Sequence, residues 1–351
     1  MEYYRNFYHE IRIPRNDFFS IEKNKNEEES VVVITSPSRM GNHLLMSILD
    51  GHPSLPRIPG EDGFLSFSFF RANVDVKKFV KNLKNKSVYY ATHLPANLGF
   101  NKWYLYSNLN ESNSDDKHSG INIDNYPAVK DYKNVNPKID YKEYEKLIKE
   151  KFLNNEKKDR YNYFLSAYMD ALRRTDYDWN KYGEKYDKII AFSGMRAQSK
   201  WMCKTHSDVK IIRSLRSLST YAVSHVKSRY KKEVSVNDKK EEIWGHWYHK
   251  VVDSVYLKEK YPEKVVLVKY DDLVESPQKE VEGICSELGI EYHESLEVPT
   301  VLSVPVSGNP SRKNVGGRGE IYSAGPKADT SIFPEDHEFL WKYIDELTAS
   351  W

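Results

Sequence analysis

The chain has 351 residues, of which 39% are hydrophobic, and its 53 Lys and Arg against 51 Asp and Glu leave a net charge of +2. This balance argues against a dedicated nucleic-acid binder, because such proteins carry a strongly basic face. The two cysteines, Cys203 and Cys285, form no CxxC pair, and the sequence has no signal peptide in residues 1–24 and no apolar run long enough to span a membrane. These features argue against a disulfide framework or a thiolate zinc site and favour a reducing, cytoplasmic location.

The first predicted unit is a strand, a loop and a helix. Residues 31–35 are β-branched and apolar up to a final threonine, which is typical of a strand buried in a parallel sheet. A loop follows at residues 36–42. Apolar residues then recur at helical spacing, at Leu44, Leu45, Ile48 and Leu49.

Further strands and helices alternate along the chain. Strands are predicted at residues 87–92, 188–192, 209–215 and 265–270, and helices at residues 220–230 and 278–288. The cations of Lys204-Thr205-His206 suit the C-terminal end of a helix. The alternation predicts an α/β fold with a mostly parallel sheet flanked by helices, in one domain spanning residues 1–351.

Residues 97–187 interrupt this alternation. The polar run at residues 107–120 predicts a loop, and helical patterns follow at residues 141–153 and 161–174. We interpret residues 97–187 as an insertion over the sheet. Two interpretations stay open: the insertion selects an acceptor molecule, or it is a structural cap without ligand contacts.

The loop at residues 36–42 is the first phosphate-binding signal. A strand that turns through small residues into a helix presents backbone N–H groups and the positive end of the helix dipole to an anion. Arg39 adds a cation and Gly41 permits close backbone approach, while the Walker pattern GxxxxGK[ST] is absent.

Residues 36–45, Ser-Pro-Ser-Arg-Met-Gly-Asn-His-Leu-Leu, with His52-Pro53 after the helix, resemble the 5′-phosphosulfate loop of sulfotransferases that use 3′-phosphoadenosine 5′-phosphosulfate (PAPS). The resemblance implies a P-loop-like fold in which Arg39 and the backbone of Met40, Gly41, Asn42 and His43 bind the donor. Asn42 and His43 replace two hydroxyl residues that are usual in the family.

Two later segments carry the same resemblance. Arg216 follows the strand at residues 209–215, and Ser224 lies eight residues later, as in the family's site for the 3′-phosphate. Arg213 competes with Arg216 for this role. Tyr270-Asp271-Asp272-Leu273 is similar to the family's Tyr-Glu-Asp-Leu, in which Tyr270 either contacts the nucleotide or belongs to the core.

The last cationic segment, Ser311-Arg312-Lys313-Asn314, is similar to a late loop of cytosolic sulfotransferases, which implies that Arg312 and Lys313 cover the 3′-phosphate. Trp244 and Trp247 resemble the family's Trp-rich helix, and we expect both to pack.

Two residues are candidates for the base that accepts the acceptor's proton. His93, in Thr92-His93-Leu94-Pro95, matches the cytosolic branch, and Glu61 matches the tyrosylprotein and bacterial branches. A neutral imidazole suits this task near pH 7, whereas a carboxylate needs burial to raise its pKa. We favour His93 slightly and keep both.

The sequence therefore predicts a PAPS-dependent sulfotransferase that acts on a hydroxyl or amine of a small molecule or glycan and releases 3′-phosphoadenosine 5′-phosphate (PAP). It predicts no metal site and no nucleic-acid partner, and it leaves the oligomeric state open. Two alternatives remain: a small-molecule kinase of P-loop-like fold, and a catalytically inactive anion- or glycan-binding protein of the same fold.

Overall fold

A computed structural model describes residues 30–35, 37, 39–55, 146–147, 150, 188–192, 196–205, 208–230, 234–301, 304–305, 321 and 326–348. Its central sheet is parallel, with the strand order β2-β1-β3-β4. The strands are β1 (Ser30–Ile34), β2 (Lys188–Phe192), β3 (Val209–Leu215) and β4 (Val265–Lys269). This confirms the predicted α/β fold. The strand predicted at residues 87–92 lies outside the described residues.

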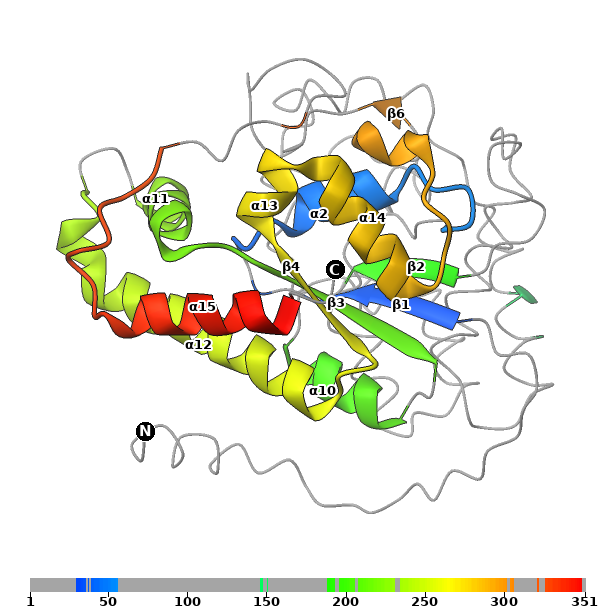
Figure 1. Cartoon of the computed structure of the whole chain (residues 1–351), viewed down its shortest axis with the longest axis horizontal. Helices are drawn as coiled ribbons and strands as arrows, with labels where there is room; N and C mark the ends of the chain where they lie inside the picture. Colours follow the sequence, from blue (N-terminus) through cyan, green and yellow to red (C-terminus); the bar gives the residue numbers. More distant parts are fainter. Residues whose placement is uncertain are drawn as a thin grey trace.

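Each face of the sheet is covered by its own layer of helices (Figure 1). One layer contains α10 (Arg196–Thr205), α11 (Leu218–Arg229), α12 (Lys240–Lys260) and α15 (Asp336–Thr348). The other contains α2 (Asn42–Leu49), α13 (Tyr270–Glu275), α14 (Pro277–Leu288) and the 3₁₀ turn η4 (Glu294–Glu297). A short 3₁₀ turn, η3 (Asn237–Lys239), precedes α12, and β5 (Thr300–Val301) pairs with β6 (Val304–Pro305).

The side chains of the strands divide between two hydrophobic cores. Val33, Ile211 and Leu215 face the core that contains Leu218 of α11 and Trp247 of α12, which we call the α12-side core. The neighbouring strand residues Val32, Ile34, Ile212, Val266 and Val268 face the core formed with α2 and α14, which we call the α14-side core. Because side chains alternate along a strand, strands buried on both faces read as continuous apolar runs.

Most predicted elements lie close to the expected bounds. The strands at residues 188–192 and 209–215 match residue for residue, and α10 ends at Thr205, as the cations beside it indicated. Other boundaries differ by one or two residues: β1 covers residues 30–34 where 31–35 was predicted, α11 covers 218–229 where 220–230 was predicted, and α14 covers 277–288 where 278–288 was predicted. The strand predicted to reach Tyr270 ends at Lys269, and Tyr270 begins α13. Asp271 and Asp272 in the first turn of α13 favour a helix start there.

Of the proposed insertion, only residues 146, 147 and 150 are described, and all three are helical. The single-domain boundary stays a prediction. Within the described ranges, no helix is both long and apolar enough to cross a membrane. Cys203 and Cys285 are free and buried, and they belong to different cores on opposite faces of the sheet.

Candidate nucleotide site

The loop between β1 and α2 has an unusual backbone. Arg39 has a φ of 70° and Gly41 a φ of 100°, so two residues of this short loop are left-handed. Such a conformation is uncommon for a residue with a side chain, and it costs about 1 to 3 kcal/mol where it occurs. Turns that contain left-handed residues direct successive N–H groups to one side, where an anion can bind.

Hydrogen bonds fix this loop to the strand beside it. The Ser214 hydroxyl of β3 donates to the Met40 carbonyl, and the Thr35 N–H donates to the Ile212 carbonyl at 3.1 Å. Met40 is fully buried in the α12-side core, so its side chain anchors the loop and only its backbone is suited to a ligand. The Asn42 side chain is also buried and donates to the Pro37 carbonyl at 3.3 Å.

Gly41 lies directly against an aromatic ring. A Cβ atom at this position would lie far inside van der Waals contact with Cδ2 of Tyr270. The positive φ already disfavours any other residue, and the ring removes the space for one. The sequence therefore requires glycine here for two separate reasons.

Arg216 is held immediately beyond the end of β3. Its side chain and backbone together are 9% exposed, and its carbonyl accepts a hydrogen bond from Nε1 of Trp247 at 2.8 Å. Its guanidinium carbon lies 3.7 Å from the centre of the Tyr270 ring, a cation–π contact. Trp247 itself is fully buried and stacks on Trp244, which confirms that both tryptophans pack.

The side chain of Asp271 lies at the N-terminal end of α11, the helix that follows Arg216. Asp271 accepts hydrogen bonds from the Ser217 N–H at 2.7 Å and from the Thr220 hydroxyl at 2.8 Å. This carboxylate satisfies a backbone donor at the positive end of α11. Ser224 lies one turn beyond Thr220, on the same face of the helix, and is 8% exposed.

Arg213 was the alternative to Arg216 for binding the 3′-phosphate. This alternative is wrong, because Arg213 is fully buried and belongs to an internal polar network. It is fully buried on the α12 side of β3 and pairs with Asp253 at 2.6 Å. It also donates to Ser254 at 3.1 Å and to Ser199 at 3.2 Å, and Ser199 donates to Thr35 at 2.6 Å. The network ends at Thr35, where the loop after β1 begins.

A polar network between α11 and α12 was missed by the sequence analysis. The Tyr221 hydroxyl accepts from Lys250 Nζ at 2.7 Å and bonds Nδ1 of His225 at 3.1 Å, and His225 Nε2 is 3.2 Å from Glu242. Burial lowers the pKa of His225. Burial raises the pKa of Tyr221, and the charges of Arg229 and Arg39 oppose this shift. The spacing of Tyr221 and His225, four residues apart on a helix, was the only signal available.

The remaining predicted site residues are not described. Glu61, His93, Arg312 and Lys313 lie outside the described residues, and so does the side chain of His43. Within the described part of the chain, no group of His, Cys, Asp and Glu is arranged to hold a metal ion.

The described site residues meet at one edge of the sheet. Gly41 follows β1, Arg216 follows β3 and Tyr270 follows β4, and these strands are neighbours in that order. The helices after β1 and β3, α2 and α11, pack on opposite faces of the sheet. Ligands of parallel α/β sheets bind at such a point, beyond the carboxyl ends of the strands.

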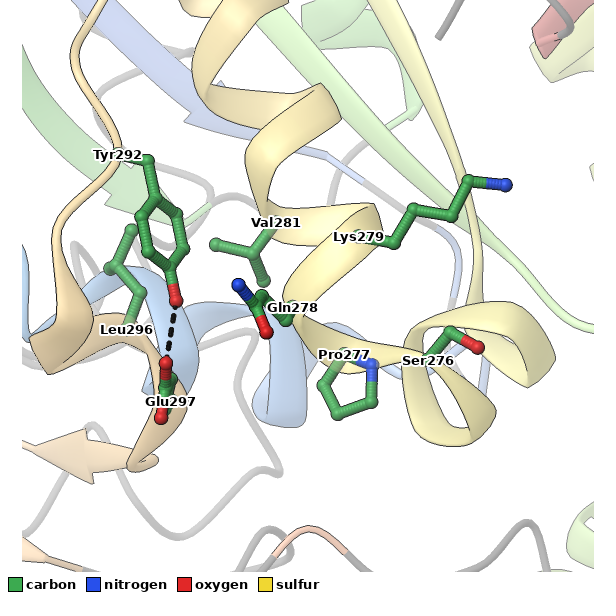
Figure 2. A pocket seen from close by; sticks show the side chains of 8 residues that line it. All are labelled: Ser276, Pro277, Gln278, Lys279, Val281, Tyr292, Leu296 and Glu297. Carbon is green, nitrogen blue, oxygen red and sulfur yellow. Dashed lines mark hydrogen bonds between the residues drawn. The ribbon is translucent and has the colours of Figure 1, made fainter.

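A separate cavity of about 470 Å³ lies at the start of α14 (Figure 2). The Tyr292 hydroxyl donates to Glu297 at 2.9 Å along one side of it, and Pro277, Gln278 and Leu296 also line it. None of the residues predicted to bind a nucleotide lines this cavity.

Comparison with known proteins gives one family and a group of solved structures. The model of the Sulfotransferase family matches residues 122–294, a segment that contains Arg216, Ser224 and Tyr270. A sulfotransferase domain of the Synechococcus PCC 7002 olefin synthase is 17% identical, with a TM-score of 0.41, over 80% of this chain and 81% of that one. A sulfotransferase domain from the curacin biosynthetic pathway is 13% identical, with a TM-score of 0.40, over 90% and 97%. A sulfotransferase from Alicyclobacillus acidocaldarius is 14% identical, with a TM-score of 0.35, over 76% and 88%. No curated protein matches the sequence.

Proposed function

Since residues 122–294 belong to the sulfotransferase family, we propose that this protein transfers a sulfuryl group from PAPS to a hydroxyl or amine of a small-molecule or glycan acceptor. PAP is the second product of this reaction. We also propose a cytoplasmic location, because both cysteines are free and thiols stay reduced in that compartment. The observation that carries the proposal is the meeting of Arg216, Tyr270 and the Gly41 loop at one edge of a parallel sheet.

The residues at this edge suit two anionic groups. The loop at Arg39, Met40, Gly41 and Asn42, with its left-handed backbone and the start of α2, would hold the 5′-phosphosulfate. Arg216, Ser224 and, from the sequence, Arg312 and Lys313 would hold the 3′-phosphate. The His43 backbone N–H would complete the loop.

The chain's own residues would then have three tasks in the reaction. PAPS supplies the sulfuryl group when it is bound. Arg39 offsets the negative charge that develops on the 5′-phosphate oxygen as the sulfur–oxygen bond breaks, a kind of stabilisation that is often worth about 3 kcal/mol. His93 or Glu61 accepts the proton of the attacking acceptor.

The first test is a calorimetric titration of the purified protein with PAP in the absence of metal. We expect micromolar binding, and we expect Arg216→Ala to weaken it about 10- to 100-fold, because a hydrogen-bonded charge pair contributes about 1.5 to 3 kcal/mol. Arg229→Ala is the matched control, since it removes the same charge from the exposed far end of α11. We expect this variant to bind like the wild type.

A folded wild-type protein that does not bind PAP would overturn the proposal. Binding of ATP with Mg²⁺ in its place would favour the kinase alternative. If PAP binds, radiolabelled PAPS and a panel of hydroxyl and amine acceptors test transfer, and His93→Ala compared with Glu61→Gln identifies the base. An inactive binding protein would be favoured if the wild type binds PAP but transfers sulfate to no acceptor, and if His93→Ala and Glu61→Gln leave PAP binding unchanged.

A further inference from the structure

One aromatic ring contacts both proposed phosphate sites. The Tyr270 ring lies 3.7 Å from the guanidinium carbon of Arg216, and on another side it occupies the space that a Cβ at Gly41 would need. Tyr270 follows β4, which neighbours β3 but not β1. The side chain therefore reaches from the end of β4 past Arg216 to the loop after β1.

The backbone around this ring is fixed on each side. Tyr270 begins α13, and the next residue, Asp271, accepts two hydrogen bonds from the start of α11. Arg216 is held at its carbonyl by Trp247, so only its side chain remains to be oriented. The face of the Tyr270 ring packs directly against this guanidinium.

An aromatic ring is well suited to this task. The flat π face of a ring stacks on the planar guanidinium and so limits the orientations that the side chain can adopt. Because the same ring contacts both Arg216 and the Gly41 loop, it links the position of one to that of the other. A rigid spacer of this kind sets the separation between two bound anionic groups.

On these grounds we propose that Tyr270 is a positioning residue that fixes Arg216 relative to the Gly41 loop, so that the site selects nucleotides carrying both a 3′- and a 5′-phosphate. This inference rests on the proposed function. It assigns Tyr270 an effect that operates through Arg216, in place of the independent contact with the nucleotide that the sequence allowed.

The inference is tested by comparing PAP with adenosine 5′-monophosphate (AMP), which lacks the 3′-phosphate. We expect Tyr270→Ala to weaken PAP binding about tenfold, because the cation–π contact and the orientation of Arg216 act at the 3′-phosphate. We expect it to weaken AMP binding less than about threefold, because the Gly41 loop is also held by the hydrogen bond from Ser214 to the Met40 carbonyl. A general loss of structure would weaken the binding of PAP and of AMP equally. Tyr270→Phe keeps the ring and should restore the PAP-to-AMP ratio.

A double-mutant cycle with Arg216→Ala separates action through Arg216 from independent contact. If Tyr270 acts through Arg216, adding Tyr270→Ala to Arg216→Ala weakens PAP binding less than about twofold further. Should Tyr270→Ala disturb folding, as judged by circular dichroism, Tyr270→Leu keeps the bulk without the π face and should give the same PAP-specific loss.

Each outcome decides one question. Additive losses in the cycle, or equal losses for PAP and AMP, overturn the positioning role while the proposed function stands. A wild-type protein that binds neither ligand overturns the proposed function and this inference with it. A PAP-specific loss that disappears in the Arg216→Ala background supports both.

Discussion

We predict that breaking the buried ion pair between Arg213 and Asp253 at the aspartate lowers the free energy of unfolding, and that replacing the arginine as well restores part of it. Arg213 is 0% exposed and the Asp253 side chain 17% exposed, with 2.6 Å between the charged atoms. Asp253→Ala removes the carboxylate that pairs with this buried guanidinium, and breaking a buried ion pair in this way typically costs about 3 to 5 kcal/mol. Because Asp253 is partly exposed, and Ser199 and Ser254 still accept from Arg213, we expect about 3 kcal/mol.

Arg213→Met should cost less, about 1 to 2 kcal/mol, because water can reach the Asp253 carboxylate that remains. Adding Arg213→Met to Asp253→Ala should then recover at least about 1 kcal/mol, because the buried cation is removed together with its carboxylate partner. The measurement is urea unfolding at pH 7 followed by circular dichroism, with the midpoint and slope compared across the four proteins.

Glu275→Ala serves as the matched control. It removes a carboxylate from a pair with Lys327 at 3.8 Å in which both side chains are more than 60% exposed. Such pairs contribute about 0 to 1 kcal/mol. An Asp253→Ala variant as stable as this control, or a double variant less stable than Asp253→Ala, would refute the account of Arg213. The account also requires Arg213→Met to keep wild-type affinity for PAP.

Three further predictions concern the loop, the histidine network and the cysteines. Gly41→Ala should lower the free energy of unfolding by more than about 1 kcal/mol, from backbone strain alone. It should also abolish PAP binding, because the new Cβ displaces the loop or the Tyr270 ring. A variant with normal stability and normal PAP binding would contradict this geometry. Burial lowers the pKa of His225, so the unfolded state takes up its proton first and stability should be lost as the pH falls below about 6.5. His225→Gln should reduce this loss in urea titrations at pH 5 and 7, and an unchanged pH dependence would assign the loss to other groups. Burial raises the pKa of both Cys203 and Cys285 to about 11. Neither thiol should therefore react with Ellman's reagent at pH 8 until urea unfolds the protein. Rapid modification of either thiol in the folded protein would show that its core is open to the reagent.

The sheet could be predicted because its signal is local. Strands buried on both faces are short apolar runs, and β2 and β3 have the bounds that the sequence indicated. The end of β4 was less clear, since Val, Leu and Tyr all suit a strand. The chain turns at Tyr270 because Asp271 caps α11, a contact with residues more than 50 positions earlier that local patterns do not contain.

The candidate site could be predicted in part. The spacing of Arg216 and Ser224 and the glycine at position 41 are visible in the sequence, because each depends on a strand that ends in a loop. Neither the Tyr270 ring between Gly41 and Arg216 nor the hydrogen bond from Trp247 to Arg216 could be predicted. Both contacts depend on which strands are neighbours, and strand order is set by the packing of the whole sheet.

Arg213 and Arg216 show how position along one strand separates structure from function. Arg213 alternates with Ile211 and Leu215, which face the α12-side core, so its charge lies inside a helix-covered layer and Asp253 neutralises it there. Arg216 follows the last residue of β3, at the carboxyl edge of the sheet, and its guanidinium packs on the face of the Tyr270 ring. A buried carboxylate partner and an aromatic partner therefore mark two different uses of arginine. In the first, the pair completes a core, and in the second we propose that the ring positions the guanidinium toward an anionic ligand.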